Sequence, residues 1–283
     1  MRFDKWQALG NDYMLIEQDK LPFSLTPARV RALCAPHTGV AADGIVLLCA
    51  SARPEAAAQL RIFNPDGSEA EVSGNGTREA VLYMRRSGWA STDNFTVDTA
   101  AGELHPTITS PTTCTVDMGN ARVRSEDYPA GDQEGRGELR AGGTSWTFRH
   151  VQVGNPQCVI RMDDERTLNS LDLSRIGPEI ERHELFPNRT NVSWYTPLGP
   201  DLIRARIFER GVGETSASGT GAAGAAVAFV LDGGDSPVTV VLDGGELQIT
   251  VQERLRVVLS GWAAPVFRGE LAQEFVEELL GLD

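Results

Sequence analysis

The sequence predicts an α+β protein made of two similar halves, each rich in β-strand with one central helix. Three observations support this prediction. The chain has 283 residues, which suits two domains of ordinary size better than one minimal core. Many short runs combine β-branched and aromatic residues and end in Gly-rich turns. Two stretches of twenty residues also resemble each other, and they lie too far apart for a solenoid repeat. A duplicated domain with a pseudo-twofold axis is therefore expected.

The duplicated stretch carries the most information. It aligns RIFNPDGSEAEVSGNGTREA, beginning at Arg61, with RIFERGVGETSASGTGAAGA, beginning at Arg206, at an offset of 145 residues. Eight of the twenty positions are identical, and these include Ser73, which pairs with Ser218. A weaker echo pairs Gly10-Asn11 with Gly154-Asn155.

Each copy predicts the same local structure. A β-rich run, Gln59 to Phe63 or Leu202 to Phe208, is followed by a polar turn, then by SGNG or SGTG, then by small residues with helical character. Each Ser-Gly-x-Gly is therefore expected at a helix N-terminus. Glycine lets backbone N–H groups approach a ligand there, and the positive end of the helix dipole favours an anion such as a carboxylate.

The rest of the chain reads mostly as short strands with a few helices. The expected strands are Phe95 to Asp98, Thr113 to Asp117, Thr147 to Val153, Cys158 to Met162, Asn191 to Tyr195, Val238 to Leu242, Leu247 to Val251 and Leu255 to Leu259. Further helices are expected at Pro27 to Ala35, Leu173 to Glu184 and Leu271 to Leu280. Arg122 to Thr144 lacks periodicity, so part of it is expected to be a mobile surface segment.

Composition excludes several classes of protein. A formal charge of −13 without a basic stripe argues against nucleic acid as a partner. The first ten residues contain no apolar signal-peptide core and no apolar run could span a bilayer, so a cytoplasmic protein with no membrane partner is expected. The cysteines and the four histidines form no ligand or disulfide pattern, so neither a metal site nor a disulfide framework is expected.

Several motifs together resemble one known family. They are LGNDY at Leu9, GVAADGIVLL at Gly39, RIFNPDGSE at Arg61, GNP at Gly154, FPNRTNV at Phe186, and ERGVGET followed by GTGA at Glu209. In this order, and over nearly the whole chain, they resemble diaminopimelate epimerase. The resemblance implies two pseudo-symmetric domains, residues 1–117 with 263–283 and residues 118–262, each a curved sheet or barrel wrapped around a central helix, with the active site in the cleft between them.

The resemblance also implies an activity. Members of the family use no cofactor and no metal, form homodimers, and interconvert LL- and meso-diaminopimelate for lysine and peptidoglycan precursor synthesis. Two opposed side chains act at the α-carbon of a small amino acid, one removing the proton and the other returning a proton from the opposite face. Two equivalent groups suit a reversible reaction, and helix N-termini aimed at the α-carboxylate would stabilise the charge that develops.

Carried over by position, the resemblance implies Ser73 and Ser218 as the acid–base pair. The residues implied for the α-carboxylate are Gly74, Asn75, Gly219 and Thr220, and those for the distal end of the substrate are Asn11, Asn64, Asn155, Asn191, Glu209 and Arg210. Arg210 would bind the distal carboxylate and Glu209 the distal ammonium.

The sequence departs from the family at the reaction centre. The family has cysteine where this chain has Ser73 and Ser218, and histidine where it has Gln157. A thiol has a pKa of about 8.5, whereas an unactivated hydroxyl approaches roughly 15.7. The gap of about 7 units corresponds to roughly 10 kcal/mol as an upper bound, because helix dipoles and desolvation also shift the serine. Impaired chemistry is therefore expected.

Alternative interpretations remain open on these residues. Two serines fit deliberate replacement of cysteines to trap an inactive enzyme, but Gln157 favours natural divergence, because a third change has no such purpose. Glu69, Glu214 or a bound water could assist a weak serine base. Each serine could instead be only a helix N-cap, which would make the protein a silent diaminopimelate-like binding relative. A racemase, isomerase or dehydratase of another small acid is the third reading.

Overall fold

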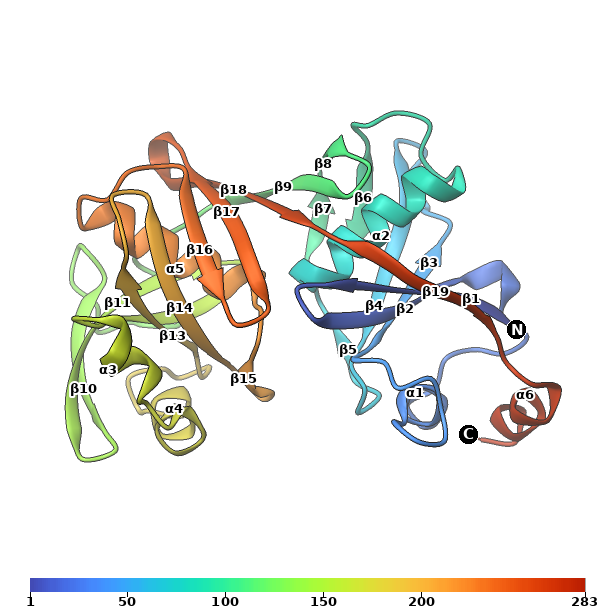
Figure 1. The fold of residues 1–283 in the computed structure, drawn as a ribbon, viewed down its shortest axis with the longest axis horizontal. Helices are drawn as coiled ribbons and strands as arrows, with labels where there is room; N and C mark the ends of the chain where they lie inside the picture. Colours follow the sequence, from blue (N-terminus) through green and yellow to red (C-terminus); the bar gives the residue numbers. More distant parts are fainter. Residues whose placement is uncertain (283) are drawn as a thin grey trace. The chain divides into compact units, whose positions relative to one another are not determined.

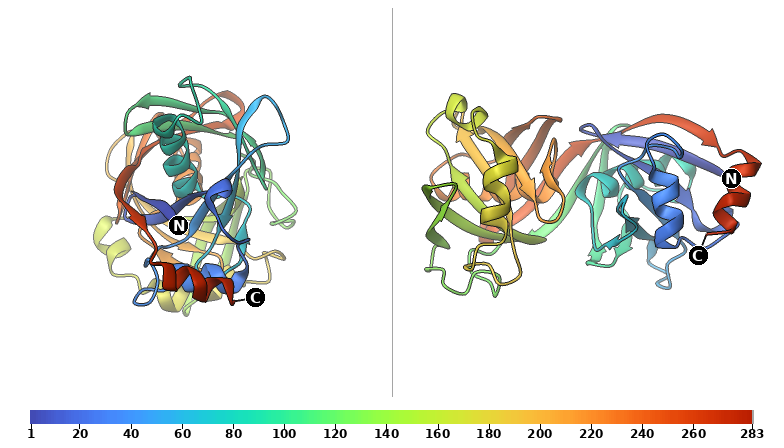
Figure 2. Two further views of the ribbon diagram at one scale, coloured as in Figure 1. Left: turned by 90° about the vertical axis from the view of Figure 1, so that its right-hand side faces the viewer. Right: turned by 90° about the horizontal axis from the view of Figure 1, so that it is seen from below.

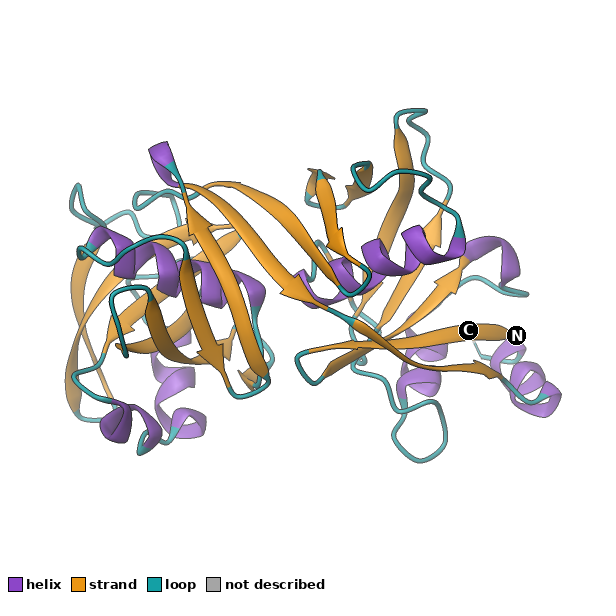
Figure 3. Ribbon diagram, turned by 45° about the horizontal axis from the view of Figure 1, so that its top comes forward, coloured by secondary structure: helices purple, strands orange, loops and turns teal. Residues whose placement is uncertain are grey.

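The computed structural model describes residues 1–282 and confirms the α+β fold. The chain forms two compact units. Unit 1 comprises Met1–Val116 together with the segment from Gly261 onward, and unit 2 comprises Asp117–Ser260. Strands outnumber helices in both units (Figure 3). Both chain ends belong to unit 1 (Figure 2).

Unit 1 is built on one mixed sheet. Its strands are β1 (Arg2–Ala8), β2 (Asn11–Glu17), β3 (Ile45–Cys49), β4 (Ala56–Phe63), β5 (Glu69–Ala70), β6 (Thr96–Thr99), β7 (Gly102–Leu104) and β19 (Ala264–Glu270). The order is β19-β1-β2-β3-β4-β6-β7, and β5 pairs with β4. The hairpin of β8 (Pro106–Ser110) and β9 (Thr113–Asn120) belongs to the second sheet of the chain, where β9 pairs with β18 (Arg256–Trp262). Helices α1 (Pro27–Cys34), α2 (Gly74–Ser87) and α6 (Gln273–Leu280) and the 3₁₀ turn η1 (Gln18–Lys20) complete the unit.

Unit 2 has the larger set of paired strands. They are β10 (Arg136–Ala141), β11 (Thr144–Val153), β12 (Asn155–Arg161), β13 (Asn191–Pro197), β14 (Leu202–Glu209), β15 (Gly213–Thr215), β16 (Val238–Leu242), β17 (Gly245–Val251) and β18 (Arg256–Trp262). They follow the order β10-β11-β12-β13-β14-β16-β17-β18, with β15 on β14. The helices are α3 (Glu165–Asn169), α4 (Leu173–Glu181), α5 (Gly219–Leu231) and the 3₁₀ turn η2 (Glu253–Leu255).

The two units share one topology. From β1 to β7 the successive pairs are antiparallel, parallel, antiparallel, parallel and antiparallel, omitting the short β5. From β11 to β17, omitting β15, the sequence of pairings is the same. In both units the short strand pairs with the strand that precedes the Ser-Gly-x-Gly turn. This agreement confirms the internal duplication predicted from the repeat.

The central helix of unit 2 shows why a sheet must wrap around it. Alanines 222, 223, 225 and 226 are all fully buried, and α5 is buried on every side from Gly219 to Phe229. The helix contacts β11, β12, β13, β14, β16 and β17 (Figure 1). A helix that is apolar all round has to be enclosed. Gly221 allows the closest approach, since a Cβ there would lie 2.6 Å from the Ile207 side chain. In unit 1, α2 contacts β1, β2, β3 and β4 in the same way.

Most predicted elements agree with the structure to within a few residues. The helices α1, α4 and α6 and all eight predicted strands are present. Strand β10 lies within the segment Arg122 to Thr144, where the sequence predicted no strand. Tyr128 in this segment is 5% exposed and packs against Phe148 and Phe186. These contacts attach the segment to the aromatic core of unit 2. Among the residues described, no helix has the length and apolar character needed to cross a membrane.

Candidate active site

Both serines of the repeat cap the central helix of their unit. Ser73 precedes α2 and its Oγ accepts a hydrogen bond from the backbone N–H of Gly76 at 3.1 Å. Ser218 precedes α5 and accepts from Gly221 at 3.2 Å. Both have extended backbone angles, as N-cap residues do. The remaining first-turn N–H groups of each helix form the positive end of its dipole, so each unit offers a place for a carboxylate beside a hydroxyl.

In unit 1 the hydroxyl of Ser73 has a second partner on a neighbouring strand. Tyr13 on β2 is 6% exposed, and its phenol donates a hydrogen bond to Ser73 Oγ at 3.1 Å. Tyr13 is part of the LGNDY motif but is not among the predicted site residues. Extending the Gly10-Asn11 echo by two positions would have drawn attention to it, because the position paired with Tyr13 is then Gln157.

The amide groups of unit 1 form a chain that ends near Ser73. Asn75 Nδ2 donates to Asn11 Oδ1 at 3.1 Å, and Asn11 Nδ2 donates to Asp43 Oδ2 at 2.9 Å. Arg78, fully buried in α2, donates to Asn75 Oδ1 at 2.6 Å. These contacts bring Asn11 and Asn75 together at the start of α2, with their side chains held in fixed orientations. Asn64 donates instead to Ser68 at 3.0 Å.

In unit 2 the hydroxyl of Ser218 is paired with a carboxylate. Ser218 Oγ donates to Glu209 Oε2 at 2.9 Å, and Thr215 Oγ1 donates to Glu209 Oε1 at 2.9 Å. Burial raises the pKa of Glu209, and the hydrogen bonds from Thr215 and Ser218 oppose that rise. Glu209 is therefore a proton acceptor of increased basicity directly on the candidate serine. The sequence predicted Glu209 as a ligand residue but did not reveal this contact with Ser218.

The other predicted residues of unit 2 lie around the end of β14. Asn191 Oδ1 accepts from the backbone N–H of Arg210 at 2.7 Å, and its Nδ2 donates to the Pro156 carbonyl at 3.3 Å. The Arg210 guanidinium donates to the Asn188 carbonyl at 2.8 Å. The hydrogen bond to the Arg210 backbone therefore places Asn191, the first residue of β13, beside Arg210, which directly follows β14. A methyl group of Thr220, at the start of α5, would lie 3.3 Å from a Cβ at Gly154, which places the GNP turn beside that helix.

Gln157 occupies the position where the family resemblance implies histidine. Its Nε2 donates to Asn155 Oδ1 at 2.5 Å, and its Oε1 is buried without a hydrogen-bond partner among the described residues. The side chain packs against α5 at Gly224, where a Cβ would lie 2.8 Å from Gln157 Cγ. Gln157 therefore fixes Asn155 and cannot serve as an acid or base at neutral pH.

A buried pair on α2 adds charge to the interior of unit 1. Arg78 and Glu79 are both completely buried, and burial lowers the pKa of Arg78 to about 10 and raises that of Glu79 well above its usual value. Nearby Asp12 and Asp43 raise the Glu79 pKa further, whereas Arg78 opposes the rise. Burial therefore favours the protonated, uncharged form of the Glu79 carboxyl. Cysteines 34 and 114 are buried thiols whose pKa burial raises to about 12, so neither replaces the missing catalytic thiols.

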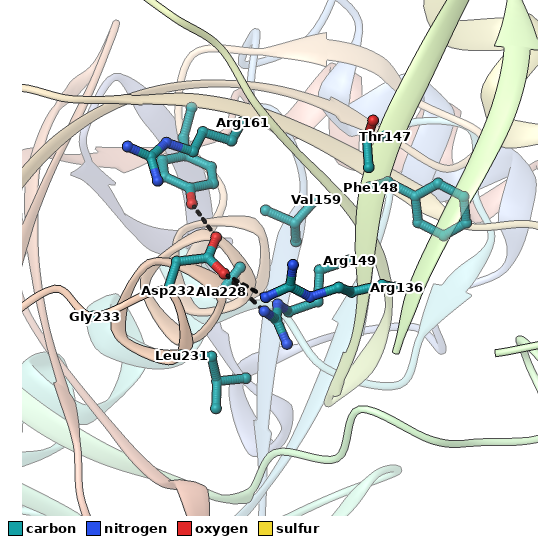
Figure 4. Close-up of a pocket in the computed structure, with 11 residues that line it drawn as sticks. Arg136, Thr147, Phe148, Arg149, Val159, Arg161, Ala228, Leu231, Asp232 and Gly233 are labelled. Atoms are coloured by element: carbon teal, nitrogen blue, oxygen red, sulfur yellow. Dashed lines mark hydrogen bonds and ion pairs between the residues drawn. The ribbon is translucent and has the colours of Figure 1, made fainter. Parts of the chain in front are cut away.

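Unit 2 also contains a pocket of about 640 Å³ at the C-terminal end of α5 (Figure 4). Arg136, Arg149 and Arg161 line it together with Asp232 and Tyr195. Arg149 and Arg136 pair with Asp232 at 2.7 and 3.5 Å, and Tyr195 donates to the same carboxylate at 3.3 Å. These contacts connect Asp232, directly after α5, to β10, β11 and β13. The pocket lies about 20 Å from Ser218, at the other end of a 13-residue helix.

Within the described part of the chain, no three metal-ligating side chains are grouped so as to hold an ion. Each unit offers one helix N-terminus with a hydroxyl, amide groups and one titratable or phenolic partner. Such an arrangement can bind a carboxylate and move a proton. Each unit therefore carries groups suited to acid–base chemistry on a small acid.

Solved structures show the class of fold. The chain superimposes on a probable proline racemase from Agrobacterium radiobacter K84 with a TM-score of 0.69, 14% identity, and coverage of 96% of this chain and 93% of that chain. A hydroxyproline epimerase from Agrobacterium vitis gives a TM-score of 0.65 at 16% identity, covering 96% and 90%. At these identities the likeness concerns the fold alone.

Sequence comparison goes further. The sequence model of the family described as diaminopimelate epimerase matches residues 3–124 and 149–264. A diaminopimelate epimerase from Synechococcus sp. strain JA-3-3Ab is 39% identical over 282 residues, covering 96% of this chain and 99% of the relative. One from Pelotomaculum thermopropionicum is 41% identical over 280 residues, covering 95% and 98%. The chain belongs to the diaminopimelate epimerase family.

Proposed function

We propose that the protein is a cofactor-independent isomerase that interconverts LL- and meso-diaminopimelate, with Ser73 and Ser218 as its acid–base pair. The observation that carries the proposal is the match to diaminopimelate epimerases over nearly the full length of the chain. The matched residues include two equivalent serines, each capping the central helix of one half of a duplicated fold. A reversible inversion at one carbon needs two such groups, one for each face.

In the proposed reaction one serine accepts the α-proton and the other delivers one. As Ser218 Oγ takes the proton from the α-carbon, its own hydroxyl proton passes to Glu209, and the electron pair of the broken C–H bond delocalises into the α-carboxylate. Ser73 then donates its hydroxyl proton to the opposite face, which restores a C–H bond of inverted configuration. The 2.9 Å contact between Ser218 and Glu209 supports the first transfer.

The serines are expected to slow this chemistry relative to thiols. A buried carboxylate with a raised pKa offsets part of the roughly 10 kcal/mol that separates a hydroxyl from a thiol as a source of anion. The helix N-termini offset a further part by stabilising negative charge at the α-carboxylate. We therefore propose a slow epimerase.

Substrate binding is proposed to follow the family pattern. The α-carboxylate is bound by backbone and side-chain donors of Gly74, Asn75, Gly219 and Thr220. The distal end is bound by amides of Asn11, Asn64, Asn155 and Asn191, with Glu209 and Arg210 as the charged partners. Glu209 then has two roles, because it contacts Ser218 as well. We further propose that the protein is cytoplasmic and acts as a homodimer in lysine biosynthesis.

A different function is supported by one pair of contacts. Because each serine accepts a hydrogen bond from its own helix, both could be structural caps in a protein that binds a diaminopimelate-like amino acid without converting it. The amide and arginine groups proposed for the distal end would be retained in such a binding protein.

Proton NMR in deuterium oxide separates the two functions. Purified protein is incubated with LL-diaminopimelate, and the α-proton signal is followed over hours against a sample without protein. Loss of signal above background supports the epimerase. Line broadening with an unchanged α-proton integral would establish the silent binding protein, and a different amino or hydroxy acid that turns over faster would reassign the substrate.

A further inference from the structure

The two serines of the duplicated fold, Ser73 and Ser218, have different hydrogen-bond partners. At the offset of 145 residues, Glu209 pairs with Asn64, so unit 1 has an amide where unit 2 has a carboxylate. Asn64 donates to Ser68. Ser218 is therefore paired with a carboxylate proton acceptor, whereas the equivalent position in unit 1 is an amide that hydrogen-bonds elsewhere.

The strands that follow the two Gly-Asn turns also differ, but here it is unit 2 that has an amide side chain. Asn11 begins β2 and Asn155 begins β12, so Tyr13 and Gln157 are each the third residue of equivalent strands. Tyr13 donates its phenolic proton to Ser73 at 3.1 Å, whereas Gln157 donates to Asn155. Unit 1 thus has a proton donor on its serine, and unit 2 has an amide at the same position.

The ring of Tyr13 is fixed so that its oxygen stays at the end of α2. A Cβ at Gly44 would lie 2.5 Å from Tyr13 Cε1, and one at Gly76 would lie 3.4 Å from its Cζ. Two glycines thus leave the space that the ring fills, one before β3 and one in the first turn of the helix that Ser73 caps. The phenol reaches Ser73 without any rearrangement.

We propose that Tyr13 is the proton donor behind Ser73, so that the enzyme has unequal arms: Ser218 with Glu209 accepts a proton and Ser73 with Tyr13 supplies one. This inference rests on the proposed epimerase function. When Ser73 protonates the carbanion, the phenolic proton passes to Ser73 Oγ, so the anion left behind is a phenolate and not an alkoxide. An ordinary phenol has a pKa of about 10, whereas an unactivated hydroxyl has one of roughly 15.7. Leaving a phenolate on Tyr13 therefore costs much less free energy than leaving an alkoxide on Ser73.

Tyr13 contacts the Ser73 hydroxyl, so we treat it as a positioning residue that acts through that hydroxyl. Its contribution should appear in which face of the carbanion is reprotonated. Without the phenol, Ser73 returns a proton poorly, and the carbanion formed by Ser218 is reprotonated from the face it came from. Solvent deuterium then enters the recovered substrate without inversion.

The test is the Tyr13→Phe variant, which keeps the ring and removes the hydroxyl. In deuterium oxide, NMR measures exchange and inversion separately, starting from LL- and from meso-diaminopimelate. We expect kcat/KM for inversion to fall about 10- to 100-fold in both directions. The ratio of exchange to inversion should rise for one starting diastereomer only. Tyr195→Phe is the matched control, because that buried tyrosine donates to Asp232 at the other end of α5; it should leave both ratios unchanged.

Two further measurements make the outcome decisive. In a Ser73→Cys background the thiol needs no donor, so adding Tyr13→Phe should change the ratio little. If Tyr13→Phe does not fold, incorporation of 3-fluorotyrosine, a more acidic phenol, should lower the exchange-to-inversion ratio of the unmutated chain. An active wild type whose ratio is unaffected by Tyr13→Phe overturns the inference alone. A wild type that exchanges no α-proton overturns the proposed function and this inference with it.

Discussion

His150 provides a stability prediction whose size can be worked from the structure. It lies on β11, is fully buried, and its Nε2 is 2.8 Å from Ser125 Oγ. Burial lowers its pKa from 6.5 to about 4, and the charge of Asp127 opposes this only in part. The folded protein therefore holds a neutral imidazole at pH values where the unfolded chain would already bind a proton.

The sign follows from proton linkage. A depressed pKa stabilises the fold above the unfolded value of 6.5, and that stability is lost as pH falls towards about 4. The shift of about 2.5 units corresponds to roughly 3 kcal/mol in total. About 2 kcal/mol of it should disappear between about pH 7.5 and about pH 5.

Urea unfolding of wild type and His150→Gln, followed by circular dichroism across this range, measures the effect. The wild type should lose stability with acidification faster than the variant, and the gap between the two should close by about 2 kcal/mol. His105→Gln is the matched control, since His105 is largely exposed, and it should track the wild type. Parallel pH profiles for wild type and His150→Gln would refute the reasoning, because the buried imidazole would then titrate alike in both states.

Three other changes have clear expected outcomes. Glu79→Gln should stabilise the fold at neutral pH and do so less near pH 4.5, since a raised carboxyl pKa favours the fold at low pH and that stability is lost as pH rises; thermal melts at the two pH values check this. Gly221→Ala should cost about 1–3 kcal/mol in chemical denaturation, because its Cβ would lie 2.6 Å from the Ile207 side chain. Combining Ser73→Cys with Ser218→Cys should raise the α-proton exchange rate by at least about 100-fold. An unchanged rate would show that the absence of thiols at these two positions does not limit the reaction.

The sequence contained enough information for the architecture because the duplication is visible in the residues. Once Arg61 and Arg206 are aligned, each strand, turn and helix start needs to be found only once. The strand β10 was missed because its alternation, with Leu139 and Ala141 inward, is short and lies within a polar Gly-rich segment. Its place is fixed by pairing with β11 and by the aromatic core, which are tertiary contacts that local pattern does not report.

The site was predictable in its residue types and less so in its contacts. The helix caps at Ser73 and Ser218 follow directly from serine before Gly-x-Gly. The hydrogen bond from Ser218 to Glu209 depends on where β14 ends relative to α5. The hydrogen bond from Tyr13 to Ser73 joins residues that are 60 positions apart in the sequence. Neither distance can be inferred from a motif, because both depend on how a sheet curves around a helix.

The pairing of β1 with β19 affects how the chain can be assembled during synthesis. β1 is made first and its outer neighbour is made after all of unit 2, because Arg2 pairs with Glu270. On the ribosome, the inserted unit therefore has every strand from β10 to β17 before unit 1 can close its edge. Until then β1 presents unpaired backbone groups, the kind of edge that invites pairing with other chains. The half of the protein that is translated first is therefore the half that is completed last.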